Sequence, residues 1–113
     1  MLQKENRLSK KSDFENVRQN GRFISSKNFT VSFVRRPAFA KASAGRFGFI
    51  VSKKISTKAH ERNRVKRILR EIIRKNLDLV KNGMDYVIIV KPSILHASHG
   101  TLEIELKDVI KNI

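Results

Sequence analysis

The side chains with the clearest chemical potential lie between residues 61 and 74, where arginine and lysine recur at close spacing. Residues 61–71 read ERNRVKRILRE. A guanidinium group is planar, permanently charged and forked, which suits it to bidentate contact with phosphate. Asn63 adds an amide that can bond a base edge or a 2′-hydroxyl. The residues that we expect to face a polyanion are Arg62, Asn63, Arg64, Lys66, Arg67, Arg70 and Arg74.

Acidic and imidazole side chains give no comparable signal for catalysis. The ten Asp and Glu residues mostly stand at expected helix ends or beside basic residues, and no pair is placed as an acid/base couple or a metal clamp. His96 and His99 have a spacing compatible with metal binding, but without cysteine or nearby carboxylates we interpret them as solvated loop residues. We therefore predict no catalytic residue and no metal ligand in this chain.

Composition narrows the class of partner. The chain has 113 residues and a net charge of +15, so we expect one domain, over residues 1–113, whose self-repulsion is offset by a polyanion. Nucleic acid is the first candidate and an anionic membrane surface the second. Cysteine is absent, which excludes disulfides and thiolate metal sites. No apolar run is long enough to span a bilayer and no secretory signal is visible, so we expect a cytoplasmic protein.

An amphipathic helix must position the basic residues. Its apolar side chains recur at i, i+3, i+4, i+7 and i+8, the period of a helix with one buried face. We expect this helix to start at a Ser56 or Thr57 cap and to run to about Asn76. On a helical wheel Asn63, Arg67, Arg70 and Arg74 lie opposite the apolar stripe, and Arg64 and Lys66 flank it. The stripe consists of Val65, Ile68, Leu69, Ile72 and Ile73. Because it is rich in β-branched residues, it is suited to packing on a sheet rather than to a membrane surface.

Periodicity and turn residues predict the other elements. The unbroken β-branched segment 85–91 indicates a central strand buried on both faces. Residues 36–45, with Pro37 and Gly45, predict a surface loop. The remaining elements are a helix at 13–19 with a Ser12–Glu15 capping box and a left-handed end at Gly21, strands at 22–25, 28–35 and 46–52, and a helix at 102–113 capped by Thr101. Together they predict an α+β domain with one sheet and helices packed on it.

A second candidate surface lies where the first helix meets the sheet. Phe14 and Arg18 belong to that helix, and Thr30 and Ser32 are small polar residues on one face of a strand. A sheet face walled by a helix could form a shallow groove in which an exposed Phe14 stacks on unpaired bases. Phe14 could equally belong to the core, and spacing alone does not distinguish the two.

Three ordered segments give the chain a family resemblance. They read NRLSKKSDFENV at 6–17, RFGFIVSKKIS at 46–56 and ERNRVKRILRE at 61–71. In this order the chain resembles the bacterial ribonuclease P protein component over almost its whole length. The resemblance implies a domain with a central mixed four-stranded sheet, whose elements follow one another along the chain in the order αβββαβα. It also implies a left-handed crossover between the strands at 46–52 and 85–91, which departs from the usual right-handed rule.

The resemblance also implies a function. The family's protein is the small subunit of a ribonucleoprotein endonuclease that removes the 5′ leader of precursor tRNA, and the RNA subunit carries catalysis with Mg²⁺. The expected partners are thus ribonuclease P RNA and precursor tRNA, with Mg²⁺ bound mainly by the RNA and the substrate, and with a monomeric protein. By position, Arg62, Asn63, Arg64, Lys66 and Arg67 would face the catalytic RNA beside Lys53 and Lys54, and Phe14 would line the leader cleft.

Some positions depart from the family pattern. Arg18 stands where a second aromatic residue is common, and Ser32 where a strand aromatic is common, so the cleft is expected to depend more on charge and less on stacking. Ser56 replaces a frequent glycine, and residues 36–45 look like a small insertion. The alternative function is a non-catalytic RNA-binding protein, such as a ribosomal protein. A nuclease that works alone would need metal-binding carboxylates that the sequence does not present.

Overall fold

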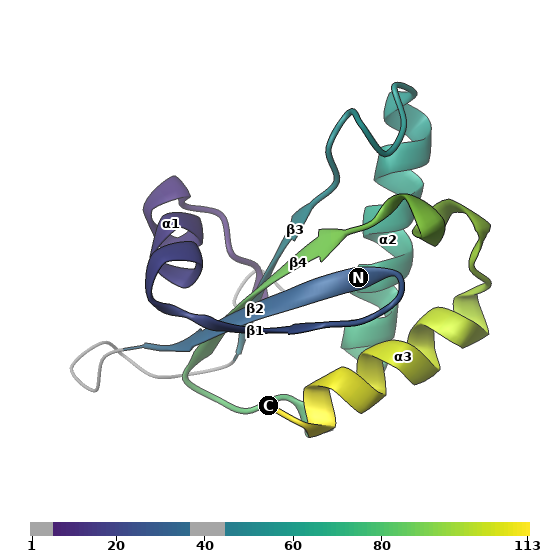
Figure 1. The fold of residues 1–113 in the computed structure, drawn as a ribbon. Helices are drawn as coiled ribbons and strands as arrows, with labels where there is room; N and C mark the ends of the chain where they lie inside the picture. The colour runs from purple at the N-terminus through teal and green to yellow at the C-terminus, as the bar shows by residue number, and fades with distance from the viewer. Residues whose placement is uncertain (1–5, 37–44) are drawn as a thin grey trace.

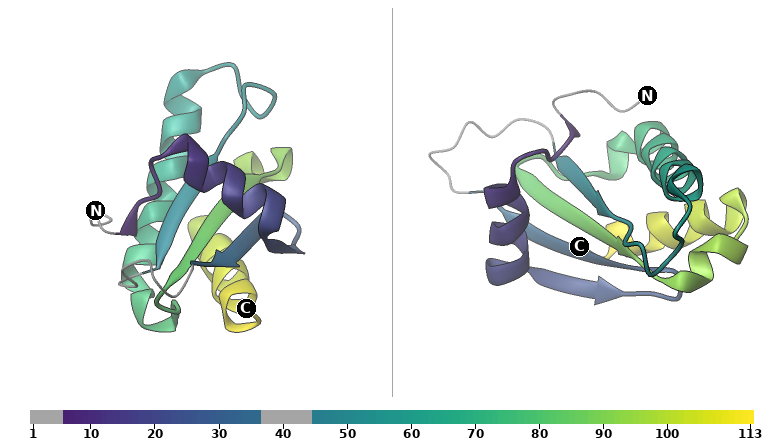
Figure 2. Two further views of the ribbon diagram at one scale, coloured as in Figure 1. Left: turned by 90° about the vertical axis from the view of Figure 1, so that its left-hand side faces the viewer. Right: turned by 90° about the horizontal axis from the view of Figure 1, so that it is seen from above.

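A computed structural model describes residues 6–36 and 45–113 of the chain. The four strands form one sheet in the order β1-β2-β4-β3, in which β3 and β4 are parallel and the other pairs antiparallel. Helices α2 and α3 cover one face of the sheet and α1 lies on the other (Figures 1 and 2). The elements are α1 (Lys11–Asn20), β1 (Arg22–Ser25), β2 (Phe29–Arg35), β3 (Arg46–Ile50), α2 (Ala59–Lys75), the 3-10 helix η2 (Leu77–Leu79), β4 (Met84–Val90), the 3-10 helix η3 (Pro92–His96) and α3 (His99–Lys111). The predicted order αβββαβα is confirmed.

The connection from β3 through α2 to β4 is a left-handed crossover. The left view of Figure 2 is seen from the side of α1, with β3 and β4 both running upward. In that view β3 lies to the left of β4, and α2 lies behind the sheet. Seen from the side of α2, the chain therefore moves leftward between parallel strands. This is the uncommon hand for such a connection, and it agrees with the expectation.

The main core lies between the sheet and helices α2 and α3. Its centre is the stacked pair Phe47 and Tyr86, whose ring centroids are 4.5 Å apart. Burial raises the pKa of Tyr86, and its hydroxyl donates to Sδ of Met84 at 3.8 Å. Strand β4 is buried along its length except at Ile89, which confirms the prediction of a central strand covered on both faces. Burying each such apolar side chain contributes roughly 1.5–3 kcal/mol.

The capping box predicted at the start of α1 and the left-handed glycine predicted at its end are both wrong. Ser12 lies inside the helix, and the N-cap is Lys10, which makes no side-chain capping bond. Gly21 has φ −90°, an extended rather than a left-handed conformation. It is required instead by close approach, since a Cβ there would lie 2.4 Å from the carbonyl oxygen of Val17 and 2.5 Å from that of Phe33.

The starts of α2 and α3 also differ from the predicted caps. The N-cap of α2 is Lys58, and Ser56 acts just before it by accepting a hydrogen bond from the Lys58 amide at 3.1 Å. The N-cap of α3 is Ser98, whose hydroxyl accepts from the Thr101 amide at 3.2 Å. As a result α3 begins at His99, which is helical rather than part of a loop.

The loop predicted at 36–45 lies outside the described residues except for its two ends. At those ends the Arg36 amide donates to the carbonyl of Gly83 at 2.8 Å, and the Asn6 side chain donates to the carbonyl of Gly45 at 3.0 Å. Its interpretation as a surface insertion stays a prediction. Among the described helices, none combines the length and the apolar character needed to cross a membrane.

Candidate nucleic-acid interface

Helix α2 divides its side chains between core and solvent largely as predicted. Val65, Leu69, Ile72 and Ile73 are buried against the sheet, and Ile68 is half-buried. The exposed polar residues on the helix include Asn63, Arg64, Arg67 and Arg74, whereas Arg62, Lys66 and Arg70 are half-buried. The predicted basic residues therefore form two groups, one exposed and one half-buried.

Arg62 and Arg74 have partners within the protein. The Nη1 of Arg62 donates to the carbonyl oxygen of Ser56 at 2.8 Å, which ties the first turns of α2 to the connection that precedes it. The Nη2 of Arg74 donates to Oε1 of Glu71 at 2.5 Å. This hydrogen bond is the main reason that the pKa of Glu71 falls to about 2. The ion pair is exposed, so Arg74 can exchange the carboxylate for a phosphate at small cost.

Arg70 lies nearer to the sheet than the helical wheel implies. Its guanidinium carbon is 5.6 Å from the ring centroid of Phe49 on β3, a cation–π contact. The expectation that Arg70 points away from the packed side is therefore wrong, because a helical wheel takes no account of an aromatic side chain on a neighbouring strand. Arg70 and Lys66 line a small hollow of about 110 Å³ with Arg7, Leu8, Phe14, Phe47, Gly48 and Phe49.

Lys53 and Lys54 extend the basic surface to the turn that precedes α2. Both are exposed in the turn that follows β3, and Figure 1 shows this connection leading directly into the first turn of α2. Glu61 stands at that first turn, where a hydrogen bond from Ser56 lowers its pKa. The turn and the exposed side of α2 together present Lys53, Lys54, Arg64 and Arg67 to solvent.

A cleft lies between α1 and the opposite face of the sheet. Its volume is about 450 Å³, and Ile50 and Ile89 on its floor are 41% and 37% exposed. Thr30 pairs with Ile89 in the register of β2 and β4, so it lies on the same sheet face just beyond the lining. The lining residues are Ser9, Lys11, Phe14, Glu15, Arg18, Ser32, Ile50, Val87 and Ile89. Three of the four residues predicted for a groove, Phe14, Arg18 and Ser32, thus line one cavity.

Phe14 serves both the cleft and the packing beneath α1. It is half-buried and packs with Leu8, Val17 and Val87 in a small second core. A Cβ at Gly48 would lie 2.4 Å from two carbons of the Phe14 ring, so the glycine leaves the room in which the ring lies. The close neighbour of Gly48 is thus a side chain, the ring of Phe14. The two interpretations of Phe14 are therefore compatible.

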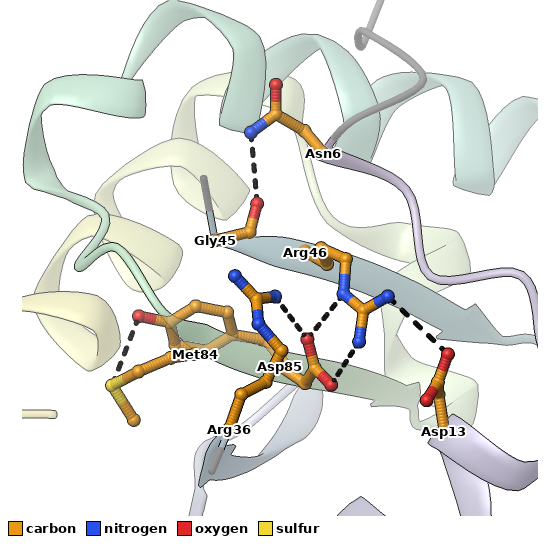
Figure 3. A network of polar contacts seen from close by, with 8 residues as sticks. Asn6, Asp13, Arg36, Gly45, Arg46, Met84 and Asp85 are labelled. Carbon is orange, nitrogen blue, oxygen red and sulfur yellow. Dashed lines mark hydrogen bonds and ion pairs between the residues drawn. The ribbon is translucent and has the colours of Figure 1, made fainter. Parts of the chain in front are cut away.

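A buried carboxylate, which no sequence pattern indicated, connects the sheet to α1. Asp85 is 1% exposed on the α1 face. It accepts from Nη1 of Arg36 and from Nε and Nη2 of Arg46, each at 2.8 Å. Arg46 also reaches Asp13 at the start of α1, at 3.5 Å (Figure 3). The hydrogen bonds that Arg46 donates to Asp85 raise the pKa of Arg46. These contacts fix the end of α1 that borders the cleft.

Clusters of three or more His, Asp or Glu residues placed to hold a metal ion are not found within 6–36 and 45–113. His96 and His99 belong to different elements, η3 and α3. The candidate surfaces on α2 and in the cleft offer cations, an amide and an aromatic ring, together with the carboxylate of Glu15 in the cleft. Cations and amides of this kind are chemically suited to a polyanion.

A mixed four-stranded sheet with a basic helix on one face and a cleft bordered by Phe14 on the other is the arrangement expected of a small nucleic-acid-binding protein. The chain belongs to the ribonuclease P protein family, which it matches over residues 2–113.

Individual relatives agree over nearly the full length. The chain is 34% identical over 122 residues to the ribonuclease P protein component of Cyanothece sp., with 97% of this chain and 93% of that protein covered. It is 34% identical over 111 residues to that of Fusobacterium nucleatum, with 95% and 96% covered. The ribonuclease P protein from Thermotoga maritima superposes with a TM-score of 0.84 at 28% identity, covering 95% and 96% of the two chains.

The chain is accordingly a protein subunit of ribonuclease P, the holoenzyme that processes the 5′ end of tRNA. This confirms the expected function at the level of the family. The alternative of a ribosomal-type RNA-binding protein is not favoured.

Proposed function

We propose that the solvent-facing side of α2 binds the RNA subunit of ribonuclease P, and that the cleft under α1 receives the 5′ leader of precursor tRNA. One observation carries this proposal. Phe14 lines both the cleft and the hollow formed with Lys66 and Arg70 of α2. Phe14 therefore joins the cleft to the half-buried basic residues of α2, so a strand held in the cleft would lie beside that helix.

The α2 surface is suited to a folded RNA backbone. Arg64 and Arg67 are exposed near Lys53 and Lys54, and each phosphate that they neutralise releases condensed counterions. Asn63 between the arginines adds donors and an acceptor for a 2′-hydroxyl. The chemical roles of this surface are neutralisation of phosphate and stabilisation of the folded RNA. We expect the affinity to fall steeply with rising salt concentration.

The cleft is suited to an unpaired strand. Its apolar floor at Ile50, Val87 and Ile89 can contact bases, and Phe14 offers an aromatic ring for stacking. Lys11 and Arg18 at its wall can neutralise the phosphates. Because stacking and charge do not read base edges, a cleft of this kind accepts leaders of differing sequence.

The remaining expectations concern the holoenzyme. We propose that Mg²⁺ is held mainly by the RNA subunit and the substrate, as the family resemblance implies, and that this chain contributes no ligand. We also propose that the chain acts in the cytoplasm and enters the holoenzyme as a monomer. In this arrangement the protein positions substrate against a catalyst made of RNA.

Replacing Phe14 with alanine tests the assignment of the cleft. We expect Phe14→Ala holoenzyme to bind precursor tRNA with a leader roughly tenfold more weakly, since one base–aromatic stack contributes about 1–3 kcal/mol. Binding of tRNA without a leader should stay unchanged. Dissociation constants for the two substrates, measured side by side with the reconstituted holoenzyme, give the comparison.

A control on the same helix separates the cleft from the packing beneath it. Val17 is the buried residue of α1 and does not line the cleft. Val17→Ala should therefore lower stability and affect the binding of both substrates alike. If Phe14→Ala instead weakens both substrates equally, as this control would, Phe14 belongs to the core and the assignment of the cleft fails.

A further inference from the structure

One row of side chains crosses the whole sheet on the cleft side, with one residue from each strand. Gly48 pairs with Val87, Val87 with Ser32, and Ser32 with Phe23. Directly paired residues project from the same face of a sheet. The Phe14 ring covers the Gly48 end of the row. Phe23 on the edge strand β1 therefore stands at the opposite end of the same surface.

Phe23 is an unusual side chain for its position. It is 69% exposed, although the burial of an aromatic ring is a large source of stability. Four large apolar side chains are exposed among the described residues, and three of them, Phe23, Ile50 and Ile89, project from the cleft face, with Phe23 the most exposed of the three. The fourth, Ile104, lies on α3 at the other side of the sheet. The apolar surface thus continues beyond the cleft toward β1.

The charges around this surface select its occupant. Arg18 lines the adjoining cleft, Arg22 precedes Phe23, and both are exposed. Lys91 donates from Nζ to the Ser25 hydroxyl at 2.7 Å, near the other end of β1. With a net charge of +15 on the chain, an apolar strip bordered by cations suits a polymer that combines flat apolar groups with phosphates. Single-stranded RNA has this chemistry.

We propose that Phe23 is a second stacking platform for single-stranded RNA, at the far end of the surface from Phe14. This inference rests on the proposed function of the cleft and extends the path of the leader across the sheet. Three strand spacings of about 4.8 Å separate the two ends of the row, or roughly 14 Å. That distance spans about four nucleotides at a helical rise of about 3.4 Å and fewer if the strand is stretched. Ser32 lies between the platforms and is small enough to leave the path open.

Phe23→Ala in the reconstituted holoenzyme tests the platform. We expect precursor tRNA with a long leader to bind about fivefold or more weakly, tRNA without a leader to bind unchanged, and Phe23→Tyr to retain the wild-type affinity because it keeps the ring. Precursor tRNAs with leaders of increasing length should locate each platform. The leader length at which Phe23→Ala begins to lower the affinity should differ by about four nucleotides from the length at which Phe14→Ala does. Ile104→Ala is the matched control, an equally exposed apolar side chain on the opposite side of the sheet.

The outcomes separate this inference from the function on which it rests. If Phe14→Ala impairs binding of the leader and Phe23→Ala does not, the second platform is overturned and the cleft stands. If neither variant shows a leader-dependent loss, the proposed function of the cleft fails as well. A Phe23→Ala loss that is equal with and without a leader, or that is matched by Ile104→Ala, would also overturn the platform.

Discussion

Replacing Arg64 and Arg67 together with alanine should lower the affinity of the protein for ribonuclease P RNA on the order of 100-fold. Hydrogen bonds to charged groups contribute about 1.5–3 kcal/mol each, and both guanidinium groups face solvent on α2. Neither residue is part of the buried face of that helix, so the fold should be retained. The slope of log affinity against log salt concentration should fall by about two, because two phosphate contacts are lost.

The matched control removes the same charge from a different helix. Lys107 and Lys111 lie on α3, and Lys107→Ala with Lys111→Ala changes the net charge by the same amount. Titration of labelled RNA at several salt concentrations measures the RNA affinity of the wild type, the Arg64/Arg67 variant and the α3 control. Unchanged affinity of a folded Arg64/Arg67 variant, or an equal loss in the α3 control, would contradict the role given to α2.

Asp85→Ala should destabilise the protein by about 3–5 kcal/mol, the usual effect of removing one member of a buried charge pair. The Asp85 side chain is 2% exposed, and those of its partners Arg36 and Arg46 are 7% and 28% exposed. Removing the carboxylate leaves two guanidinium groups close together in a chain that already carries +15. It also breaks the link from β4 through Arg46 to Asp13 on α1, so the cleft should lose its defined width.

Urea unfolding followed by circular dichroism measures this loss. Asp108→Ala, which removes an exposed carboxylate from α3, is the control and should change the unfolding free energy by about 0.5 kcal/mol or less. A loss of less than about 1 kcal/mol for Asp85→Ala would mean that the network does not hold α1 in place. Both variants raise the net charge equally, so general repulsion cannot explain a difference between them.

The strands and the buried face of α2 could be predicted because their signals are periodic. The alternation in β2 and the unbroken apolar segment in β4 each depend on many residues, so one residue that departs from the pattern does not change the predicted strand. Helix caps depend on one side chain, and neighbouring candidates compete. Ser98 and Thr101 both suit an N-cap, and the path of the chain out of η3 selects Ser98.

The contacts between distant segments could not be predicted. Asp85 and Arg46 are 39 residues apart and meet because β3 and β4 pair in parallel register. The face of the sheet that carries the cleft depends on where α1 packs, which no local pattern specifies. The exposed Phe23 looks like an ordinary strand residue until its register opposite Ser32 is known.

Cleavage of precursor tRNA at low Mg²⁺ concentration tests the central claim most directly, which is that this chain supports a catalyst made of RNA. Cognate ribonuclease P RNA is assayed with and without the protein, and the protein is assayed alone. We expect accurate 5′ processing that the protein strongly stimulates in the presence of the RNA, and no processing by the protein by itself. Cleavage by the protein without RNA, or an RNA activity that the protein leaves unchanged, would contradict the account.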